Sequence, residues 1–386
     1  MKRVVSFLLC FLIAFSYQVP VSAEEKLELT AKSAIVMEAS TGRIIYEDNS
    51  TQALPPASVT KVMTLLLIFE AIHQGKINLQ DEVTVSEHAA SMGGSQVFLE
   101  AGEVQTVEVM IKSIAVASGN DASVAMAEHI AGSESAFVTQ MNQKAKELGM
   151  KQTAFKNCCG LDVDDHVTSA KDIALMSREL ITKYPEVLKY SSIWMDEFTH
   201  KTKKGESVFG LSNTNKLLKQ YQGCTGLKTG STSQAKFCLS ATAERNGISL
   251  IAVVMASNSS KERVKDASTL LDYGFANCKK YTAPSLDKKL KPVPVTKGEQ
   301  EEAQIMCEKS FETVLVNGES EDGITYNIQR KKNLKAPLKK GDTAGWVTYY
   351  QKGSYIGKVK LVVKKNIKEM TLEKSMERIL KQFFSS

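Results

Sequence analysis

The sequence predicts an α+β domain, followed by a small β-rich domain and a C-terminal amphipathic helix. Apolar, strand-like segments stand at both ends of the first region, and helical periodicity fills the stretch between them. This grouping favours a sheet layered against helices over a repeated βαβ series. With 386 residues, 43% of them hydrophobic, the chain has the length and composition of two globular domains.

The N-terminus predicts export. Lys2 and Arg3 precede an apolar stretch over residues 4–19, and the small residues Val21-Ser22-Ala23 follow it. This is the pattern of a secretory signal peptide, which we assign to residues 1–23. An uncleaved anchor is the weaker alternative, because the uninterrupted apolar run is shorter than the roughly 20 residues that a span needs. We therefore expect an exported protein, peripheral at the outer face of the cytoplasmic membrane or in the cell wall.

The first folded domain is expected over residues 24–278. Two strands surround the turn Ser40-Thr41-Gly42, and a helix opens at Ala57-Ser58 after Pro55-Pro56. A second hairpin turns at Arg245-Asn246-Gly247. The expected strands are 29–37, 43–47, 235–244 and 248–256, and the further helices are 106–116, 121–130, 134–148, 169–183 and 260–275.

A change of composition marks the second domain, expected over residues 279–366. Residues 278–297 are rich in Lys and Pro and lack helical periodicity, so we interpret them as the boundary. The short strands expected beyond this boundary are 311–316, 325–329, 345–350 and 358–363.

The last segment, residues 367–386, predicts an amphipathic helix. Its apolar residues fall on one helical stripe, formed by Leu372, Met376, Ile379, Leu380 and Phe383. Packing against its own domain is one interpretation of the stripe. Because the segment ends an exported chain, we favour an interfacial membrane anchor.

The net charge of +6 is unevenly distributed. Residues 279–386 carry 22 Lys and Arg against 13 Asp and Glu, or +9, which leaves −3 for residues 1–278. No zinc knuckle or aromatic-basic motif accompanies the excess, so nucleic acid is not an expected partner. A basic second domain that faces an anionic cell envelope is the better interpretation.

A candidate nucleophile stands at the start of the helix that opens at residue 57. Ser58-Val59-Thr60-Lys61 puts a hydroxyl and an amine on one helix face, since residues three apart are neighbours. A serine is a weak nucleophile until a neighbour removes its proton, and a lysine with a lowered pKa can do so. The pattern alone is weak, because Ser-x-x-Lys also occurs at Ser233/Lys236 and Ser285/Lys288.

Two rarer motifs follow in order. Ser118-Gly119-Asn120 is the only Ser-x-Asn of the chain, and Lys228-Thr229-Gly230 is its only Lys-Thr-Gly. Each alone is compatible with a helix cap or a surface turn. Together with Ser58 and Lys61 they supply a hydroxyl relay, an orienting amide and a cation for a substrate carboxylate. The three motifs define the superfamily of penicillin-binding proteins and serine β-lactamases.

The chain resembles a low-molecular-mass penicillin-binding protein, a D-alanyl-D-alanine carboxypeptidase. The likeness covers about residues 29–275 and, more weakly, 280–365. The stretches that carry it are Pro56-Ala57-Ser58-Val59-Thr60-Lys61, Ala117-Ser118-Gly119-Asn120-Asp121-Ala122, His166-Val167-Thr168-Ser169-Ala170-Lys171-Asp172 and Gly226-Leu227-Lys228-Thr229-Gly230. The resemblance implies a β-lactamase/transpeptidase-like domain, in which a five-stranded antiparallel sheet is flanked by helices.

The resemblance also implies the reaction and the role of each residue. Ser58 would attack the carbonyl between the two terminal D-alanines of a peptidoglycan stem peptide, and Lys61 would take its proton. Ser118 and Asn120 would move protons and hold the peptide. Lys228 and Thr229, with Gly230, would bind the terminal carboxylate. The backbone N–H groups of Ser58 and Ser231 would hold the oxyanion, and penicillins would acylate Ser58.

No cofactor and no metal are expected. The chain has no C-x-x-C pair, and its five histidines lack ligand spacing. The six cysteines outside the signal peptide are left unassigned, with buried small side chains as the favoured interpretation. Thr225, Ser231 and the adjacent pair Cys158-Cys159 depart from the family pattern.

Three rival functions are weighed against the carboxypeptidase. A class A β-lactamase needs a Glu-x-x-x-Asn loop, which residues 140–190 lack. A non-catalytic wall-binding protein predicts a broken motif, yet every group is present. A transpeptidase or endopeptidase remains open, because water and an amine compete for the same acyl-enzyme.

Overall fold

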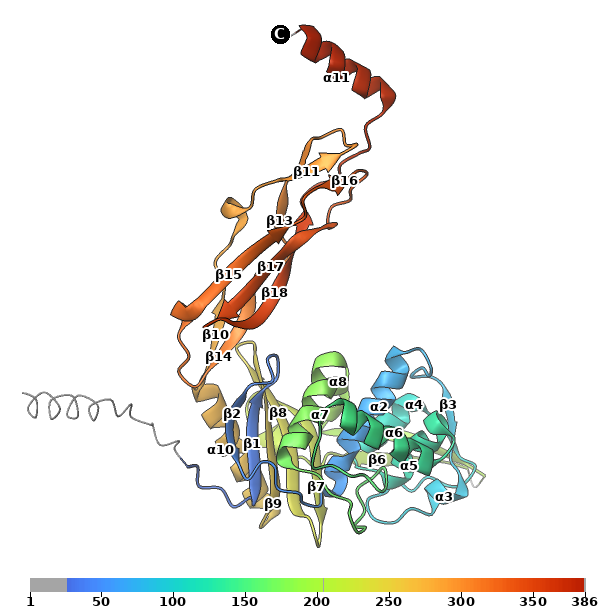
Figure 1. Cartoon of the computed structure of the whole chain (residues 1–386). Coiled ribbons are helices and arrows are strands. Elements are labelled where there is room, and N and C mark those ends of the chain that lie inside the picture. Colours follow the sequence, from blue (N-terminus) through green and yellow to red (C-terminus); the bar gives the residue numbers. More distant parts are fainter. Residues whose placement is uncertain (1–25, 204, 385–386) are drawn as a thin grey trace, which may run out of the picture.

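The computed structural model describes residues 26–203 and 205–384, without the side chains of 381–383. The predicted signal peptide lies outside these residues. The described chain forms an α+β domain, a β-rich domain that stands on one end of it, and a helix at the far end of the second domain (Figure 1). The predicted fold class is confirmed.

A five-stranded antiparallel sheet organises the first domain, with strand order β2-β1-β9-β8-β7. Its strands are β1 (Ser33–Glu38), β2 (Ile44–Asp48), β7 (Cys224–Thr232), β8 (Lys236–Arg245) and β9 (Ile248–Ser257). Neighbouring residues of a strand point to opposite faces. Ile251 therefore joins a core with the helical lobe, while Leu250 joins a second core against α10 (Ser260–Ala276). Burial on both faces explains why β9 reads as a continuous apolar run.

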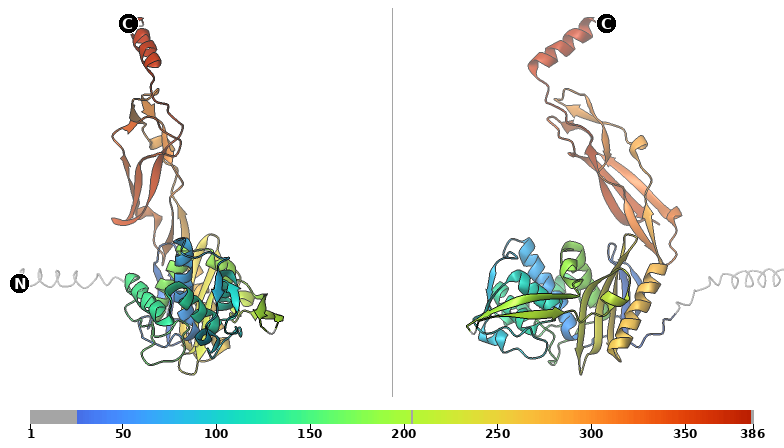
Figure 2. Two further views of the ribbon diagram at one scale, coloured as in Figure 1. Left: turned by 90° about the vertical axis from the view of Figure 1, so that its right-hand side faces the viewer. Right: turned by 180° about the vertical axis from the view of Figure 1, so that it is seen from behind.

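The helical lobe lies on the other side of the sheet from α10 (Figure 2). It contains the 3₁₀ turn η1 (Ala57–Thr60), α2 (Lys61–His73), α3 (Glu87–Ala90), α4 (Val107–Ala115), α5 (Asn120–Ala131), α6 (Glu134–Glu147), α7 (Ala170–Lys183) and α8 (Val187–Ser191). Thr106, Ser133, Ser169 and Ser259 accept a hydrogen bond from a backbone N–H in the first turn of α4, α6, α7 and α10. These caps fix the helix starts close to where the sequence predicts them.

Several elements differ from the prediction. The helix expected from Ala57 is a 3₁₀ turn followed by α2, and Ala57 has a positive φ of 48°. The hairpin of β5 (Met195–Thr202) and β6 (Gly205–Ser212) was not predicted, nor was the pair β3 (Glu82–Thr84) and β4 (Val104–Thr106). Short α9 (Leu217–Gln220) precedes β7.

The second domain is built from short strands. Four of them form a sheet in the order β13-β18-β17-β15. The strands are β10 (Cys278–Thr282), β11 (Val293–Thr296), β12 (Glu302–Ala303), β13 (Ile305–Cys307), β14 (Glu312–Val316), β15 (Ile324–Arg330), β16 (Leu334–Lys335), β17 (Thr343–Gln351) and β18 (Ser354–Val363), with 3₁₀ turns η2 (Asp287–Lys289) and η3 (Glu321–Gly323).

The junction between the two domains is structured. Residues 278–297, interpreted as the boundary, include a strand that was not predicted, because β10 lies there and pairs along its length with β14. Val314 and Val316 of β14 pack into the core beneath α10, and Asn317 Nδ2 donates to the Ile45 carbonyl at 3.1 Å. We keep 278/279 and 366/367 as predicted domain boundaries.

The last helix, α11 (Leu372–Phe384), lies beyond the second domain (Figures 1 and 2). Its polar face contacts that domain through two ion pairs, Lys374–Glu299 at 2.7 Å and Arg378–Glu301 at 3.3 Å. The side chains of Leu372, Met376, Ile379 and Leu380 are exposed, with Leu372 at 81% and Ile379 at 62%. The predicted stripe residue Phe383 lies outside the described side chains.

Candidate active site

Ser58 and Lys61 meet at the junction of η1 and α2. The Lys61 Nζ lies 3.1 Å from the Ser58 Oγ. Ser58 is half-buried, whereas Lys61 is fully buried. The Lys61 ammonium also donates to Asn120 Oδ1 at 2.6 Å and to the Cys159 carbonyl at 2.7 Å. Three oxygen atoms therefore hold the buried amine in place. Of the two side chains, only that of Ser58 is partly accessible to solvent.

Burial changes the acidity of Lys61. It lowers the pKa of the ammonium to about 8, although the nearby Cys159, Cys158 and Asp121 oppose the shift. Desolvation penalises the charged form, and the neighbours that bond the nitrogen are neutral oxygens rather than carboxylates. Lys61 can thus lose a proton close to neutral pH, which a base needs.

The second motif lies at the start of α5. Ser118 is buried and has a positive φ of 64°, which is unusual for a residue with a Cβ. Its Oγ has no hydrogen-bond partner among residues 26–203 and 205–384. Asn120 donates from Nδ2 to the Gly93 carbonyl at 2.7 Å, so its Oδ1 is turned toward Lys61. Strain and an unused hydroxyl of this kind are typical of a functional site.

The third motif lies on β7, one of the two edge strands of the five-stranded sheet. Lys228 is 1% exposed, and its Nζ donates to the Thr229 carbonyl at 3.0 Å. Burial lowers its pKa well below the usual range, and the positive charges of Lys61 and Arg263 lower it further. The Thr229 hydroxyl lies 2.5 Å from that of Thr214.

Gly230 brings β7 against the nucleophile turn. A Cβ at this position would lie 2.8 Å from the Pro56 carbonyl and 2.9 Å from the Ser58 nitrogen. Only glycine permits such a close approach. The next residue, Ser231, is exposed at the same end of the strand. The structure therefore brings together the segments that carry Ser58, Lys61, Asn120, Lys228 and Ser231.

Sequence reasoning missed three supporting residues. Arg263 of α10 is buried and donates from Nη1 to the Gly230 carbonyl at 3.2 Å. His166 accepts from the Lys156 N–H at 3.0 Å, so its Nε2 donates to the Thr60 hydroxyl at 2.9 Å. Asp121 accepts from the N–H groups on both sides of Phe98. His166 and Asp121 stand in stretches that carried the resemblance, whereas nothing in the sequence pointed to Arg263.

The turn at residues 157–160 forms the wall behind Lys61. Asn157 Oδ1 accepts from the N–H groups of Cys159, Gly160 and Leu161. A Cβ at Gly160 would lie 1.8 Å from the Ala57 carbonyl, so the turn presses against η1. The adjacent cysteines, left without a role by the sequence, thus sit in the wall that positions Lys61.

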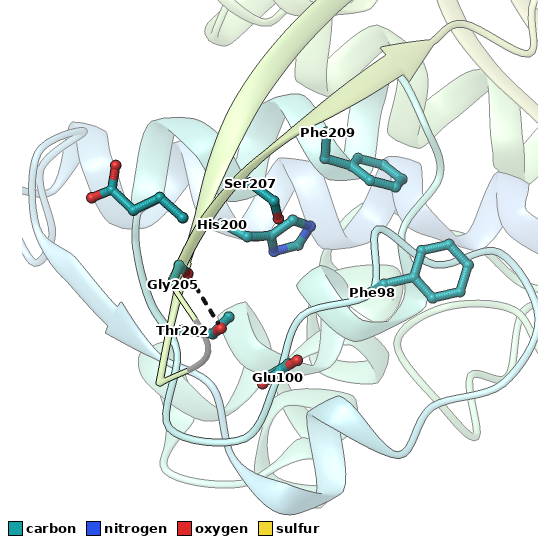
Figure 3. A pocket seen from close by; sticks show the side chains of 8 residues that line it. Phe98, Glu100, His200, Thr202, Gly205, Ser207 and Phe209 are labelled. Carbon is teal, nitrogen blue, oxygen red and sulfur yellow. Dashed lines mark hydrogen bonds between the residues drawn. The ribbon is translucent and has the colours of Figure 1, made fainter.

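A separate hollow of about 370 Å³ lies between the β5–β6 hairpin and the loop that carries Phe98 (Figure 3). Phe98, His200 and Phe209 line it. The His200 ring is held by the buried Glu103 at 2.9 Å. None of the predicted site residues lines this hollow, so it does not contain the candidate nucleophile.

Comparison with known proteins gives two family matches. A family described as D-alanyl-D-alanine carboxypeptidase matches residues 20–259, and one described as penicillin-binding protein 5, C-terminal domain, matches residues 281–369. The curated D-alanyl-D-alanine carboxypeptidase DacF of Bacillus subtilis (strain 168) is 41% identical over 375 residues, which cover 96% of this chain and 95% of that protein.

Two solved structures have the same architecture. The crystal structure of penicillin binding protein 5 from Haemophilus influenzae matches with a TM-score of 0.66 and 32% identity, over 90% of this chain and 100% of that one. A peptidoglycan synthesis regulatory factor (PBP3) from Streptococcus pneumoniae matches with a TM-score of 0.73 and 28% identity, over 89% and 100%.

Proposed function

The chain belongs to the D-alanyl-D-alanine carboxypeptidase family, and we propose that Ser58 is the nucleophile on which it carries out that reaction. The protein is a serine-type carboxypeptidase that removes the terminal D-alanine from peptidoglycan stem peptides in cell wall biogenesis. The assignment of Ser58 rests on the 3.1 Å contact between its Oγ and the Lys61 amine, which is buried and forms no ion pair with a carboxylate in the described part of the chain.

The proposed first step is acylation. Lys61 takes the Ser58 proton as the oxygen attacks the carbonyl between the two D-alanines. The charge that develops on the carbonyl oxygen is held by the N–H groups of Ser58 and Ser231, and one such donor is typically worth about 3–4 kcal/mol. As the carbon–nitrogen bond breaks, Ser118 gives its hydroxyl proton to the leaving amine of D-alanine and takes the proton that Lys61 removed from Ser58, so that Lys61 is neutral again. Water then hydrolyses the ester and restores Ser58.

Substrate selection is assigned to the edge of β7. Lys228 is a buried amine that no carboxylate pairs with in the described part of the chain, and its lowered pKa reflects the missing counter-ion. A carboxylate that arrives from outside would favour the charged ammonium form and pair with it. The terminal carboxylate of the stem peptide would bind there, beside the Thr229 hydroxyl, while Gly230 allows β7 to lie close to the turn that carries Ser58. Asn120, which stands at the start of α5 and accepts from Lys61, would hold the peptide from the helical lobe.

Labelled penicillin and a defined D-Ala-D-Ala pentapeptide test the assignment. We expect a covalent penicillin adduct on Ser58 and release of free D-alanine, and both should be lost in Ser58→Ala. Release that persists in this variant would remove Ser58 from the mechanism. Product masses separate trimmed from cross-linked peptides, and so distinguish hydrolysis from transpeptidation.

We also propose that the protein is exported and is held at the outer face of the membrane by α11. No helix within the described residues has the length and apolar character that crossing a membrane requires. Support for a surface anchor comes from the orientation of α11. Lys374 and Arg378 pair with Glu299 and Glu301 of the second domain, while Leu372, Met376 and Ile379 are exposed. A helix of this kind lies in the interface plane, with its apolar face among the acyl chains.

A further inference from the structure

Glu134, Cys158 and Cys159 form a compact group of metal-binding side chains behind the active site. One ligand atom from each residue lies within 4.8 Å of the others. Both cysteines are buried, at 0% and 1% exposure, and neither belongs to a disulfide. Glu134 comes from a different part of the chain, the first turn of α6. The group therefore depends on the tertiary fold.

The backbone holds these ligands together. The Cys158 N–H donates to Glu134 Oε1 at 3.0 Å, which ties the carboxylate to the cysteine turn. The other oxygen, Oε2, lies 3.1 Å from Nε2 of His88, an exposed residue of α3. The Asn157 side chain fixes the turn from the other side through three backbone N–H groups. Such supporting contacts are what orients the ligands in a metal site.

The donor set has a chemical preference. Two thiolates and one carboxylate suit a soft or borderline divalent cation such as Zn²⁺ or Cd²⁺, and not Mg²⁺ or Ca²⁺, which prefer oxygen. Three protein ligands leave a fourth position of the tetrahedron for water. The exposed His88 contacts Glu134, which is less buried than the two cysteines.

We propose that Glu134, Cys158 and Cys159 bind one thiophilic divalent cation of the Zn²⁺ class. Binding replaces the two thiol protons by two sulfur–metal bonds and releases both protons to water, while Glu134 supplies an oxygen. The expectation of no metal rested on the missing C-x-x-C pair and the scattered histidines. It did not consider adjacent cysteines completed by a carboxylate from a distant helix. This site goes beyond the carboxypeptidase reaction and does not depend on it.

The position of the site gives the cation a structural effect. The Cys159 carbonyl accepts from Lys61, and the Cys158 carbonyl accepts from the Thr64 hydroxyl at 2.5 Å. A cation would link α6 to the turn on which these two residues of α2 rest. Because a ligand that binds only the folded state stabilises it by mass action, the loaded protein should unfold at a higher temperature.

The test uses the reduced, chelator-treated full chain titrated with Cd²⁺, whose thiolate complexes absorb in the ultraviolet. We expect one equivalent to bind, with a thiolate-to-metal absorption band and a higher melting temperature. Cys158→Ser/Cys159→Ser should lose the band and the stabilisation. Cys224→Ser/Cys278→Ser is the matched control, because it removes two thiols elsewhere and should keep both signals.

A second variant covers the case in which the double cysteine variant fails to fold. Glu134→Gln keeps every thiol, and we expect its Cd²⁺ affinity to fall by at least about 10- to 100-fold, because the loss of a direct ligand should cost no less than the loss of a supporting contact, for which this range is typical. An absorption band that survives Cys158→Ser/Cys159→Ser, an unchanged affinity in Glu134→Gln, or wild-type protein that binds no Cd²⁺ would each overturn the proposal.

Discussion

The helices α2 and α11 have the same length of 13 residues, but they use apolar and charged side chains in opposite ways. In α2, ten residues are buried, and Lys61 is among them. In α11, the described residues of the apolar stripe are exposed, and Lys374 and Arg378 lie against the acidic Glu299 and Glu301. The apolar residues of α2 belong to the hydrophobic core, as expected, whereas a fully buried lysine is unusual and indicates a chemical role. In α11 the charged residues form ordinary surface ion pairs, whereas the exposed apolar stripe indicates contact with an apolar surface such as a membrane.

The largest effect is expected from the buried charge of α2. Lys61→Ala should slow acylation of Ser58 by labelled penicillin by about 10²- to 10⁴-fold, since a general base contributes this much. Lys76→Ala, at an exposed lysine just beyond α2, is the control and should acylate normally. Melting curves establish that both variants fold. Normal acylation in Lys61→Ala would show that burial of this lysine is structural only.

The apolar stripe of α11 is tested on vesicles that contain anionic lipid. Met376→Glu/Ile379→Glu should weaken vesicle binding by about 100-fold or more, because two apolar side chains, worth about 1.5–3 kcal/mol each, no longer enter the bilayer. Sedimentation measures the bound fraction, and Glu377→Gln on the polar face serves as the control. Hydrolysis of a soluble peptide should be unchanged. Undiminished binding, also after removal of residues 372–386, would contradict the anchor.

Lys228 extends the comparison between buried and exposed charges, because it is a second buried lysine that no carboxylate neutralises in the described part of the chain. Lys228→Ala should lower kcat/KM for a peptide with a free C-terminus by about 10- to 100-fold, the value of a charge-assisted hydrogen bond. The wild type should prefer this peptide to its C-terminal amide, and the variant should lose that preference. If the ratio of the two substrates does not change, Lys228 does not read the carboxylate.

The smallest effect concerns His166, which supports η1 through Thr60. Burial lowers the pKa of His166 to about 4 from an ordinary value of 6.5. Between these values the unfolded chain binds a proton that the folded chain does not, so the free energy of unfolding falls as the pH falls from 6.5 to 4. The loss at pH 4.5 should be about 2–3 kcal/mol.

Urea unfolding at pH 7 and pH 4.5 measures this loss. His166→Asn removes the titrating ring, so its stability should change less between the two pH values than that of the wild type. Equal changes in the two proteins would assign the acid sensitivity to other groups.

Much of the fold was predictable because local signals and tertiary packing agree. The caps Ser133, Ser169 and Ser259 mark helix starts in the sequence, and the turn Arg245-Asn246-Gly247 joins β8 to β9 as predicted. The β5–β6 hairpin was missed because most of its residues are exposed and give no clear apolar alternation. Strand β10 was missed because its residues pair with residues of β14 that lie 30 to 38 positions further along the chain, and its own composition is basic.

The motifs of the candidate site could be predicted from the sequence, but the burial of its side chains and the contacts that surround them could not. Ser58, Lys61, Asn120 and Lys228 could be named from spacing and resemblance. The full burial of both lysines could not, since it depends on the Cys159 carbonyl and on strands distant in sequence. Arg263 gave no signal because a single arginine on an amphipathic helix usually faces solvent, whereas here it reaches the Gly230 carbonyl.

The insertion of Val314 and Val316 into the core beneath α10 has a consequence for where the enzyme works. A domain joined by a loose tether samples every height above its attachment point. A domain that packs into the core of its neighbour keeps the active site at a fixed distance from the anchoring helix. With α11 bound to a lipid surface, the second domain would act as a spacer of fixed length. The active site would then reach stem peptides in one thin layer of the wall rather than throughout its depth.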